Sequence, residues 1–360
     1  DVLARRVEGY RSSWLDELCA TGELVWVGAE GGRVSLLYRD EAPLFGPPPG
    51  AAPAPHGEAH EAVRAVLAAQ PRFLGEVAAA TGLGHSELTA TLWDLASAGE
   101  ITNDTFASLR TPRTAPAPRQ AARVAGRRLA RRRSAPAGAS LGRWSATAAL
   151  YVNAAEPGER ARAIAELLLE RHGVLTRRAV AAEQVPGGFS GVYRALSDLE
   201  TLGTCRRGWF VEGRGGAQFA LPGAIERLRD AREAPLEPVY TVLAATDPAN
   251  LYGATLPWPR RAAGRAARAI GAYVVLRDGE PELYVERGGK SLLTLSDAAA
   301  ENLGPALAAL AGEVRSGRPK RLAVERLDAE SALASPSLAA FLAAGFEPGP
   351  RRLVLRAPRA

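Results

Sequence analysis

The 360-residue chain contains no methionine, two cysteines and four histidines. Two cysteines cannot form a disulfide framework, so a reducing compartment is expected. The histidines are too scattered for the ligand spacing of a metal site. Apolar runs are short and interrupted, and the first residues are charged, so neither a membrane-spanning helix nor a signal peptide is expected. The missing initiator methionine favours a piece of a longer protein.

The net charge of +6 is concentrated in one segment. Residues 111–140 contain eight arginines and no acidic residue, so removing their +8 leaves −2 for the rest of the chain. A basic protein is a candidate for nucleic-acid binding, but here each folded part must be judged by its own charge. The segment is also rich in proline and alanine, which is typical of a linker.

Three segments repeat the order of three helices followed by a β-hairpin, which is the pattern of a winged helix. The clearest copy spans 158–222, a second spans 60–110, and a truncated copy starts the chain. In each copy a glycine ends the last helix, and Glu or Thr follows it before the next strand. These glycines are Gly22, Gly99 and Gly203.

The fold class predicted from these patterns is α+β, with tandem winged helices followed by a small β-barrel-like domain. Short strands beyond residue 238 alternate with turns such as Asp278-Gly279, which favours a strongly bent sheet or small barrel. The predicted parts are the end of a winged helix at 1–47, a winged helix at 56–110, a basic linker at 111–140, a winged helix at 141–235 and the barrel-like domain at 236–360.

Several sequence runs together resemble the C-terminal extension of the bacterial large helicase-related protein family, of the long actinobacterial type. They are RHGVLTR at 171–177, VPGGF at 185–189, FVEG at 210–213, QFALPG at 218–223, DPANLYG at 247–253, LPWP at 256–259, VERGGK at 285–290 and GEITND at 99–104. The match runs in order along nearly the whole chain.

This resemblance implies a parent protein that is an ATP-dependent 3′-to-5′ DNA helicase in DNA repair, with its motor N-terminal to this chain. It implies DNA and that helicase core as partners, a homo-oligomer with a tetramer favoured, and a cytoplasmic, nucleoid-associated location. It also implies a layout similar to alkylpurine-type DNA glycosylases with tandem winged helices. This chain is then expected to serve oligomer assembly and auxiliary DNA binding.

Neither of two enzyme signatures is present in the sequence. Gly289-Lys290-Ser291 ends like a phosphate loop, but Tyr284 stands where its first glycine is needed, so no ATP or other cofactor is expected. The Gln-x-Gln or Gln-x-Asp motif of the resembled glycosylases is absent too. A glycosylase for uracil or an alkylated base stays open, with Asp104 or Asp247 as the carboxylate. For both residues the alternative is a turn or cap. A tandem winged-helix transcription regulator also stays open.

Arginine clusters mark the candidate DNA contacts, since guanidinium groups bind phosphate. The alternatives are a disordered tether for the linker, a solvated hairpin for the wing and a solvated loop after Trp258. The candidates are Arg127, Arg128, Arg131 and Arg132 in the linker, Arg206, Arg207 and Arg214 in the last wing, and Arg260 and Arg261, with Arg265 and Arg268, after Trp258.

The unit at 56–110 carries a net charge of −4, and its third helix contains Glu87 and Asp94 but no Lys or Arg. Phosphate contact by that helix would be repulsive, so this unit is expected to bind protein rather than DNA. Trp93 lies off the apolar stripe of the same helix and is the candidate interface anchor.

Overall fold

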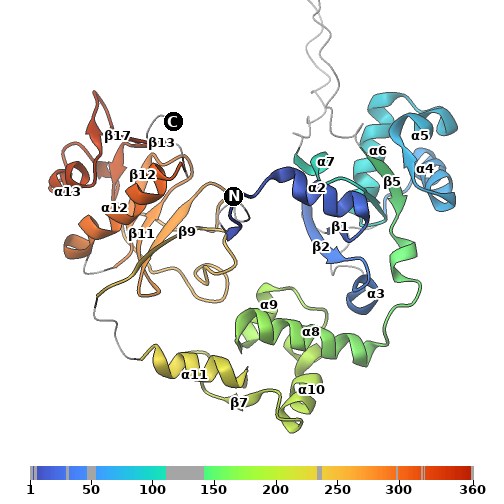
Figure 1. Ribbon diagram of the computed structural model, residues 1–360, viewed down its shortest axis with the longest axis horizontal. Coiled ribbons are helices and arrows are strands. Elements are labelled where there is room, and N and C mark those ends of the chain that lie inside the picture. Colours follow the sequence, from blue (N-terminus) through green and yellow to red (C-terminus); the bar gives the residue numbers. More distant parts are fainter. Residues whose placement is uncertain are drawn as a thin grey trace, which may run out of the picture. The chain divides into compact units, whose positions relative to one another are not determined.

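The computed structural model describes residue 3 and residues 6–29, 32–46, 54–110, 142–232, 237–296, 299–317, 319 and 321–357 (Figure 1). The chain divides into two compact units. One comprises Asp1–Glu8, His172–Glu183 and Arg206–Ala360, and the other comprises Gly9–Arg171 and Gln184–Cys205. Within the described residues, no helix is both long and apolar enough to cross a membrane.

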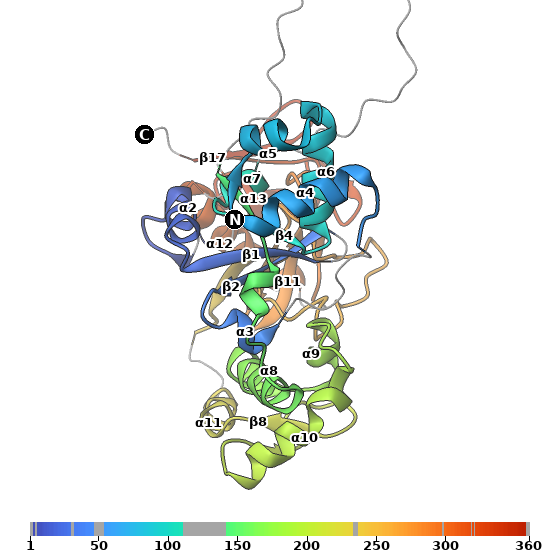
Figure 2. The same ribbon diagram turned by 90° about the vertical axis from the view of Figure 1, so that its right-hand side faces the viewer.

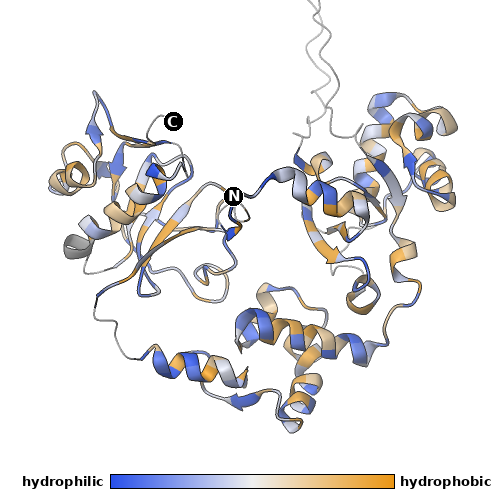
Figure 3. Cartoon of the chain, viewed as in Figure 1, coloured by the Kyte–Doolittle hydropathy of each residue, from blue (hydrophilic) through white to orange (hydrophobic). Residues whose placement is uncertain are grey.

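The N-terminal segment is a short helix followed by a two-stranded ribbon. Its elements are α2 (Ser12–Thr21), β1 (Leu24–Ala29), β2 (Arg33–Tyr38) and α3 (Ala42–Phe45). As predicted, Gly22 ends α2, with φ of 83° in the left-handed region that glycine adopts without strain. β1 and β2 are rich in hydrophobic residues (Figure 3), but β1 is buried while Val34, Leu36 and Tyr38 of β2 are exposed.

The next part, called here the middle winged helix, packs three helices against a small sheet (Figures 1 and 2). Its elements are α4 (Glu58–Ala69), β3 (Arg72–Phe73), α5 (Leu74–Thr81), α6 (His85–Ser97), β4 (Ile101–Asn103), α7 (Ala107–Arg110) and β5 (Arg143–Ala146). The strand order is β3–β5–β4, and both pairings are antiparallel.

The position of β5 corrects two predicted boundaries. Arg143–Ala146 was assigned by sequence to the following winged helix, and 111–140 to a linker between the two. Instead, β5 pairs with β3 and β4, and its Trp144 is fully buried in the same core as Leu67 and Leu92. The arginine-rich segment is therefore an insertion inside the middle winged helix, between two strands of its sheet.

The N-terminal segment and the middle winged helix share one core. Trp26 of β1 is 1% exposed, and its Nε1 donates to the Thr105 carbonyl at 3.2 Å. The Thr102 hydroxyl donates back to the Trp26 carbonyl at 2.5 Å. A Cβ on Gly28 would lie 1.9 Å from the carbonyl oxygen of Ala96, so only glycine allows the two backbones to approach this closely.

The third part, the last winged helix, contains the elements α8 (Pro157–His172), β6 (Val174–Leu175), α9 (Arg177–Ala182), α10 (Gly188–Thr201), β7 (Arg206–Gly208) and β8 (Gln218–Ala220), preceded by η2 (Ala148–Tyr151) and followed by α11 (Pro222–Asp230). The sheet order is β6–β8–β7. Thr176 caps α9, as its position predicts, because its hydroxyl accepts from the Ala179 N–H at 3.2 Å. The predicted apolar faces of α8 and α10 are buried.

The C-terminal part combines a six-stranded sheet, a three-stranded sheet and two helices. Its elements are β9 (Tyr240–Ala244), β10 (Tyr273–Arg277), β11 (Glu280–Val285), β12 (Ser291–Thr294), α12 (Ala299–Arg315), β13 (Arg321–Val324), β14 (Arg326–Leu327), β15 (Glu330–Ser331), α13 (Leu338–Ala343), β16 (Glu347–Pro348) and β17 (Leu353–Arg356).

The strand orders in this part are β15–β14–β12–β11–β10–β9 and β13–β17–β16. Among the described strands, the two ends of the larger sheet do not pair with each other, so the predicted small barrel is not confirmed. The predicted turn at Asp278-Gly279 does join an antiparallel hairpin, with both residues at positive φ.

Candidate nucleic-acid interface

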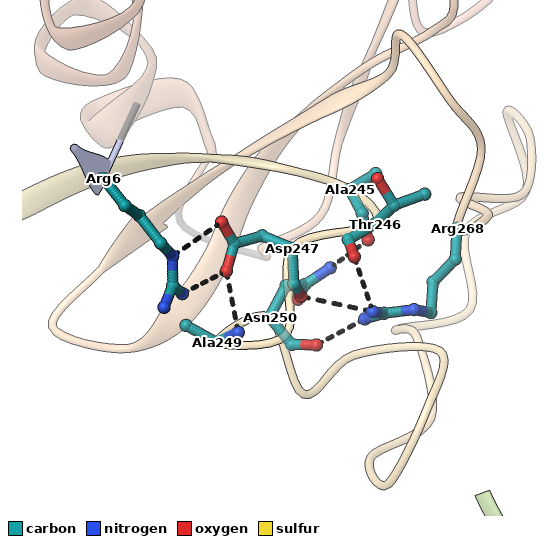
Figure 4. Close-up of polar contacts among 7 residues, drawn as sticks. All are labelled: Arg6, Ala245, Thr246, Asp247, Ala249, Asn250 and Arg268. Carbon is teal, nitrogen blue, oxygen red and sulfur yellow. Dashed lines mark hydrogen bonds and ion pairs between the residues drawn. The ribbon is translucent and has the colours of Figure 1, made fainter. Parts of the chain in front are cut away.

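The long loop between β9 and β10 is fixed by buried polar side chains near its start (Figure 4). Asp247 is 2% exposed, and its carboxylate accepts from the Ala249 N–H at 2.8 Å. The same carboxylate forms an ion pair with Arg6, in which Nη2 lies 2.5 Å from Oδ1. Both oxygens are therefore engaged in holding the loop and the N-terminal residues of the same compact unit.

Asn250 and Arg268 complete this network (Figure 4). Asn250 is 1% exposed; its side chain donates to the Ala245 carbonyl at 2.8 Å and accepts from the Tyr252 N–H at 3.1 Å. Arg268 donates to the carbonyls of Thr246, Asp247 and Asn250. Burial lowers the pKa of Arg268, and the Asp247 carboxylate opposes that shift. A fully bonded network of this kind holds the loop in one conformation.

The loop lines an open pocket of about 590 Å³. Gly253 lets the backbone approach Trp258, since a Cβ there would lie 2.2 Å from the indole Nε1. Trp258 also packs against Tyr252 and Tyr284, each with a ring-centre distance of 5.8 Å. The residues that line the pocket are Arg178, Gly253, Pro257, Trp258, Pro259, Arg260, Arg261, Gly264, Arg265 and Ala266.

Four of these lining residues are arginines and none is acidic. Arg178, Arg260 and Arg265 are exposed, whereas Arg261 is partly buried and donates to the Leu295 carbonyl. Guanidinium groups around an open, partly aromatic surface are suited to binding phosphate and bases. Among the residues that line this pocket, none carries a carboxylate or a thiol.

A second basic surface is the wing formed by β7, β8 and the turn between them. Arg206 is exposed at the start of this wing, and the Arg207 guanidinium lies 5.1 Å from the centre of the buried Phe219 ring. Arg214 is half-buried in the turn, and its carbonyl accepts from the Gln218 side chain at 2.9 Å.

Asp104 and Trp93 belong to the middle winged helix and to neither of these two surfaces. Asp104 accepts from the backbone N–H and the Nε of Arg143 at 2.7 and 2.8 Å, so it bridges the two ends of the arginine-rich insertion. Trp93 is half-buried and packs against Trp26 and Trp144, with ring centres 6.4 and 5.5 Å away. It thus contributes to the core shared with the N-terminal segment. Arg127, Arg128, Arg131 and Arg132 lie outside the described residues.

Sequence reasoning grouped Arg268 with the exposed arginines, but the structure places it inside the loop. It also missed Arg178 as a lining residue, because Arg178 belongs to α9 and is far from the loop in sequence. Arg6 was missed for the same reason. In the described part of the chain, no three His, Cys, Asp or Glu side chains cluster in a way that would hold a metal ion.

Repeated units of three helices and a hairpin, with arginines on a wing and around a pocket, define a tandem winged-helix protein. Two family models of the large helicase-related protein Lhr match this chain. The model of the fourth winged-helix domain of Lhr matches residues 154–239, and the model of its third winged-helix domain matches residues 1–39. The chain belongs to the Lhr family and corresponds to a portion of those longer proteins.

Two curated relatives agree with this assignment. The Lhr helicase/probable uracil glycosylase of Mycolicibacterium smegmatis is 41% identical over 99% of this chain, and the Lhr helicase/uracil glycosylase of Escherichia coli is 37% identical over 81%. The chain spans 25% and 20% of their lengths. The solved Streptomyces sahachiroi DNA glycosylase AlkZ is 17% identical, with a TM-score of 0.49 over 90% of this chain and 87% of its own. Similarity at that level carries no further argument.

Proposed function

We propose that this chain is an accessory region of an ATP-dependent 3′-to-5′ DNA helicase in DNA repair, acting at the nucleoid in the cytoplasm, and that it holds DNA through its backbone. The observation that carries the proposal is the pocket that Arg178, Arg260 and Arg265 line together with Trp258, with no acidic residue in its lining. Phosphate contacts from such side chains position DNA without reading its sequence. The wing arginines supply a second contact of the same kind.

Replacing Arg260 and Arg265 together by alanine tests this role of the pocket. Loss of two phosphate contacts is expected to weaken binding at least about tenfold and to reduce the slope of log affinity against log salt by about two. Arg352→Ala is the matched control, because Arg352 is an exposed arginine in the same compact unit but away from the pocket. Equal binding by the double variant and the control would contradict the proposal.

The arginine-rich insertion is a further source of attraction for DNA in this proposal. Its eight arginines carry no acidic compensation, and electrostatic attraction of this kind is sequence-independent and sensitive to salt. Deleting residues 111–140 is expected to reduce the slope of log affinity against log salt further. This reduction should add to the effect of replacing Arg260 and Arg265 by alanine. Asp104 and Arg143 link the end of β4 to the start of β5, so a short glycine-serine connection in place of residues 111–140 should leave both strands undisturbed.

Assembly into an oligomer, with a tetramer favoured, is the other part of the proposed role. Its support is the edge strand β2, which exposes Val34, Leu36 and Tyr38 in a row on one face. Exposed apolar rows on edge strands favour association between chains. Light scattering at micromolar concentration should give a multiple of 37.9 kDa, and Leu36→Lys should lower that mass. A single-chain mass for the unmodified protein would remove this part of the proposal.

A DNA glycosylase for uracil or an alkylated base is the second candidate function, because both curated relatives bear uracil glycosylase in their names. Asp247 is the carboxylate whose network reaches the pocket, because a Cβ on Gly253 would lie 3.0 Å from the Arg268 side chain and 2.2 Å from Trp258. Base release from a uracil-containing oligonucleotide tests this candidate. Loss of release in Asp247→Asn but not in Asp104→Asn would support it, and no release from the unmodified chain would contradict it.

A transcription regulator built from tandem winged helices is the third candidate. It alone predicts a preferred sequence, because regulators read base edges rather than phosphates. Selection from random duplexes distinguishes it: an enriched motif would support a regulator, and unselected binding would support the accessory role.

A further inference from the structure

Trp209 is the most exposed large hydrophobic residue among those described, at 83%. It follows β7 directly, at the start of the wing turn of the last winged helix. An indole ring left in water forgoes the free energy that its burial in a core would provide. The residues around it show how the wing holds it there.

The backbone on both sides of Trp209 is fixed. Before it, β7 pairs with β8, and Gly208 lies opposite Gln218. After it, the N–H groups of Phe210 and Val211 both donate to Gln218 Oε1, at 3.0 and 2.8 Å. The Gln218 side chain is fully buried and donates in turn to the carbonyls of Val211 and Arg214 at 2.9 Å. Four hydrogen bonds to one side chain therefore close the turn.

Phe210 and Trp209 have opposite orientations. The Phe210 ring folds back over Gly208, where a Cβ would lie 2.7 Å from the ring. Phe210 is half-buried as a result, while the adjacent Trp209 points to solvent. The turn thus uses one aromatic residue as an anchor and presents the other in a preset position, which reduces the conformational entropy lost on binding.

We propose that Trp209 stacks on an unpaired nucleobase of DNA held by the wing. This inference rests on the proposed DNA-binding function and extends it from the phosphate backbone to the bases. Arg206, Arg207 and Arg214 belong to the same wing as Trp209, with a single acid, Glu212, between β7 and β8, which gives the wing the positive charge that DNA requires. A base in a paired duplex is covered on both faces, so a single strand or an opened duplex end is the fitting ligand.

Two short single strands of equal length test the proposal with the full chain, one carrying thymine at every position and one carrying abasic sites. At about 0.15 M salt, Trp209→Ala should weaken binding to the thymine strand by about 5- to 100-fold and leave binding to the abasic strand unchanged. Trp209→Phe should retain part of the affinity, since a smaller ring still stacks. Ile270→Ala is the matched control, because Ile270 is 75% exposed in the same compact unit.

The arginine variant Arg206→Ala distinguishes the inference from the function on which it rests. It should weaken binding to both strands, because the phosphates are present in both. If Arg206→Ala weakens binding and Trp209→Ala does not, stacking is wrong and DNA binding stands. If the unmodified chain binds neither strand, the DNA-binding role itself is wrong. If Trp209→Ala changes only the oligomeric mass, the ring binds protein and the inference is overturned.

Discussion

The middle and last winged helices share one pattern but use their wings in opposite ways. In the middle one, the wing strands β4 and β5 are separated by the arginine-rich insertion, and Trp144 of β5 is buried in a core shared with the N-terminal segment. In the last one, the wing is a short closed turn that exposes Trp209 and Arg206. One wing is covered by protein, and the other is open to a ligand.

The third helix is not basic in either of these winged helices. α6 contains Glu87 and Asp94 without a Lys or Arg, and α10 contains Arg194 against Asp198 and Glu200. Winged helices that read a sequence place this helix in the major groove, where acidic residues are repelled by phosphate. The positive charge lies instead on a wing, on an insertion and around a pocket. A shared winged-helix pattern therefore does not determine which element contacts DNA.

Gly28→Ala is expected to have the largest effect, and it tests the core that the N-terminal segment shares with the middle winged helix. The new Cβ meets the backbone of Ala96 and Ser97, which cannot move without disturbing α6, so a loss of about 3 kcal/mol in unfolding free energy is expected. Urea unfolding measures it. Gly75→Ala is the control, because Gly75 is helical with open space around it, and it should be neutral or slightly stabilising. Equal stabilities would show that the shared core is not tight.

Gln218→Leu tests the closed turn in the wing of the last winged helix. It removes four hydrogen bonds and leaves the amides of Phe210 and Val211 to find water, with an expected loss of about 2 kcal/mol. Hydrogen exchange at those two amides should accelerate more than about tenfold. Amides of the middle winged helix should not change, and the exposed Gln70→Leu should leave both units unchanged. Unchanged exchange at Phe210 would show that other contacts close the turn.

Local patterns predicted the parts of the fold that depend on neighbours in sequence. The three glycines that end a helix, the Thr176 cap and the apolar face of α10 all follow from spacing. Long-range pairing could not be predicted in this way. β5 rejoins its sheet after a long insertion, and Arg6 meets Asp247 across 241 positions. The candidate site was predicted in part for the same reason, because its loop arginines are adjacent in sequence and Arg178 is not.

Asp104→Asn tests the contact between β4 and β5, the two wing strands that the arginine-rich insertion separates. Asp104 holds both the backbone and the side chain of Arg143, so the charged pair takes the place that Gln218 has in the closed wing. Loss of the charge is expected to reduce stability by about 1 kcal/mol. Labelling of the buried Cys19 under native conditions should then rise about fivefold, whereas labelling of Cys205 should not. Equal increases at both cysteines would show that the middle and last winged helices open together.

The smallest expected effect is a dependence on pH that arises in the core shared by the N-terminal segment and the middle winged helix. Burial raises the pKa of the Cys19 thiol, and the nearby Asp16 carboxylate adds to this increase. The folded state therefore keeps its proton longer than the unfolded state, whose thiol ionises near about pH 8.5. This stabilisation is complete below that pH and is lost as pH rises, so the unfolding free energy should fall as the pH is raised through the alkaline range. Cys19→Ala should lose this component of the pH dependence. An unchanged slope in Cys19→Ala would mean that other groups cause the dependence.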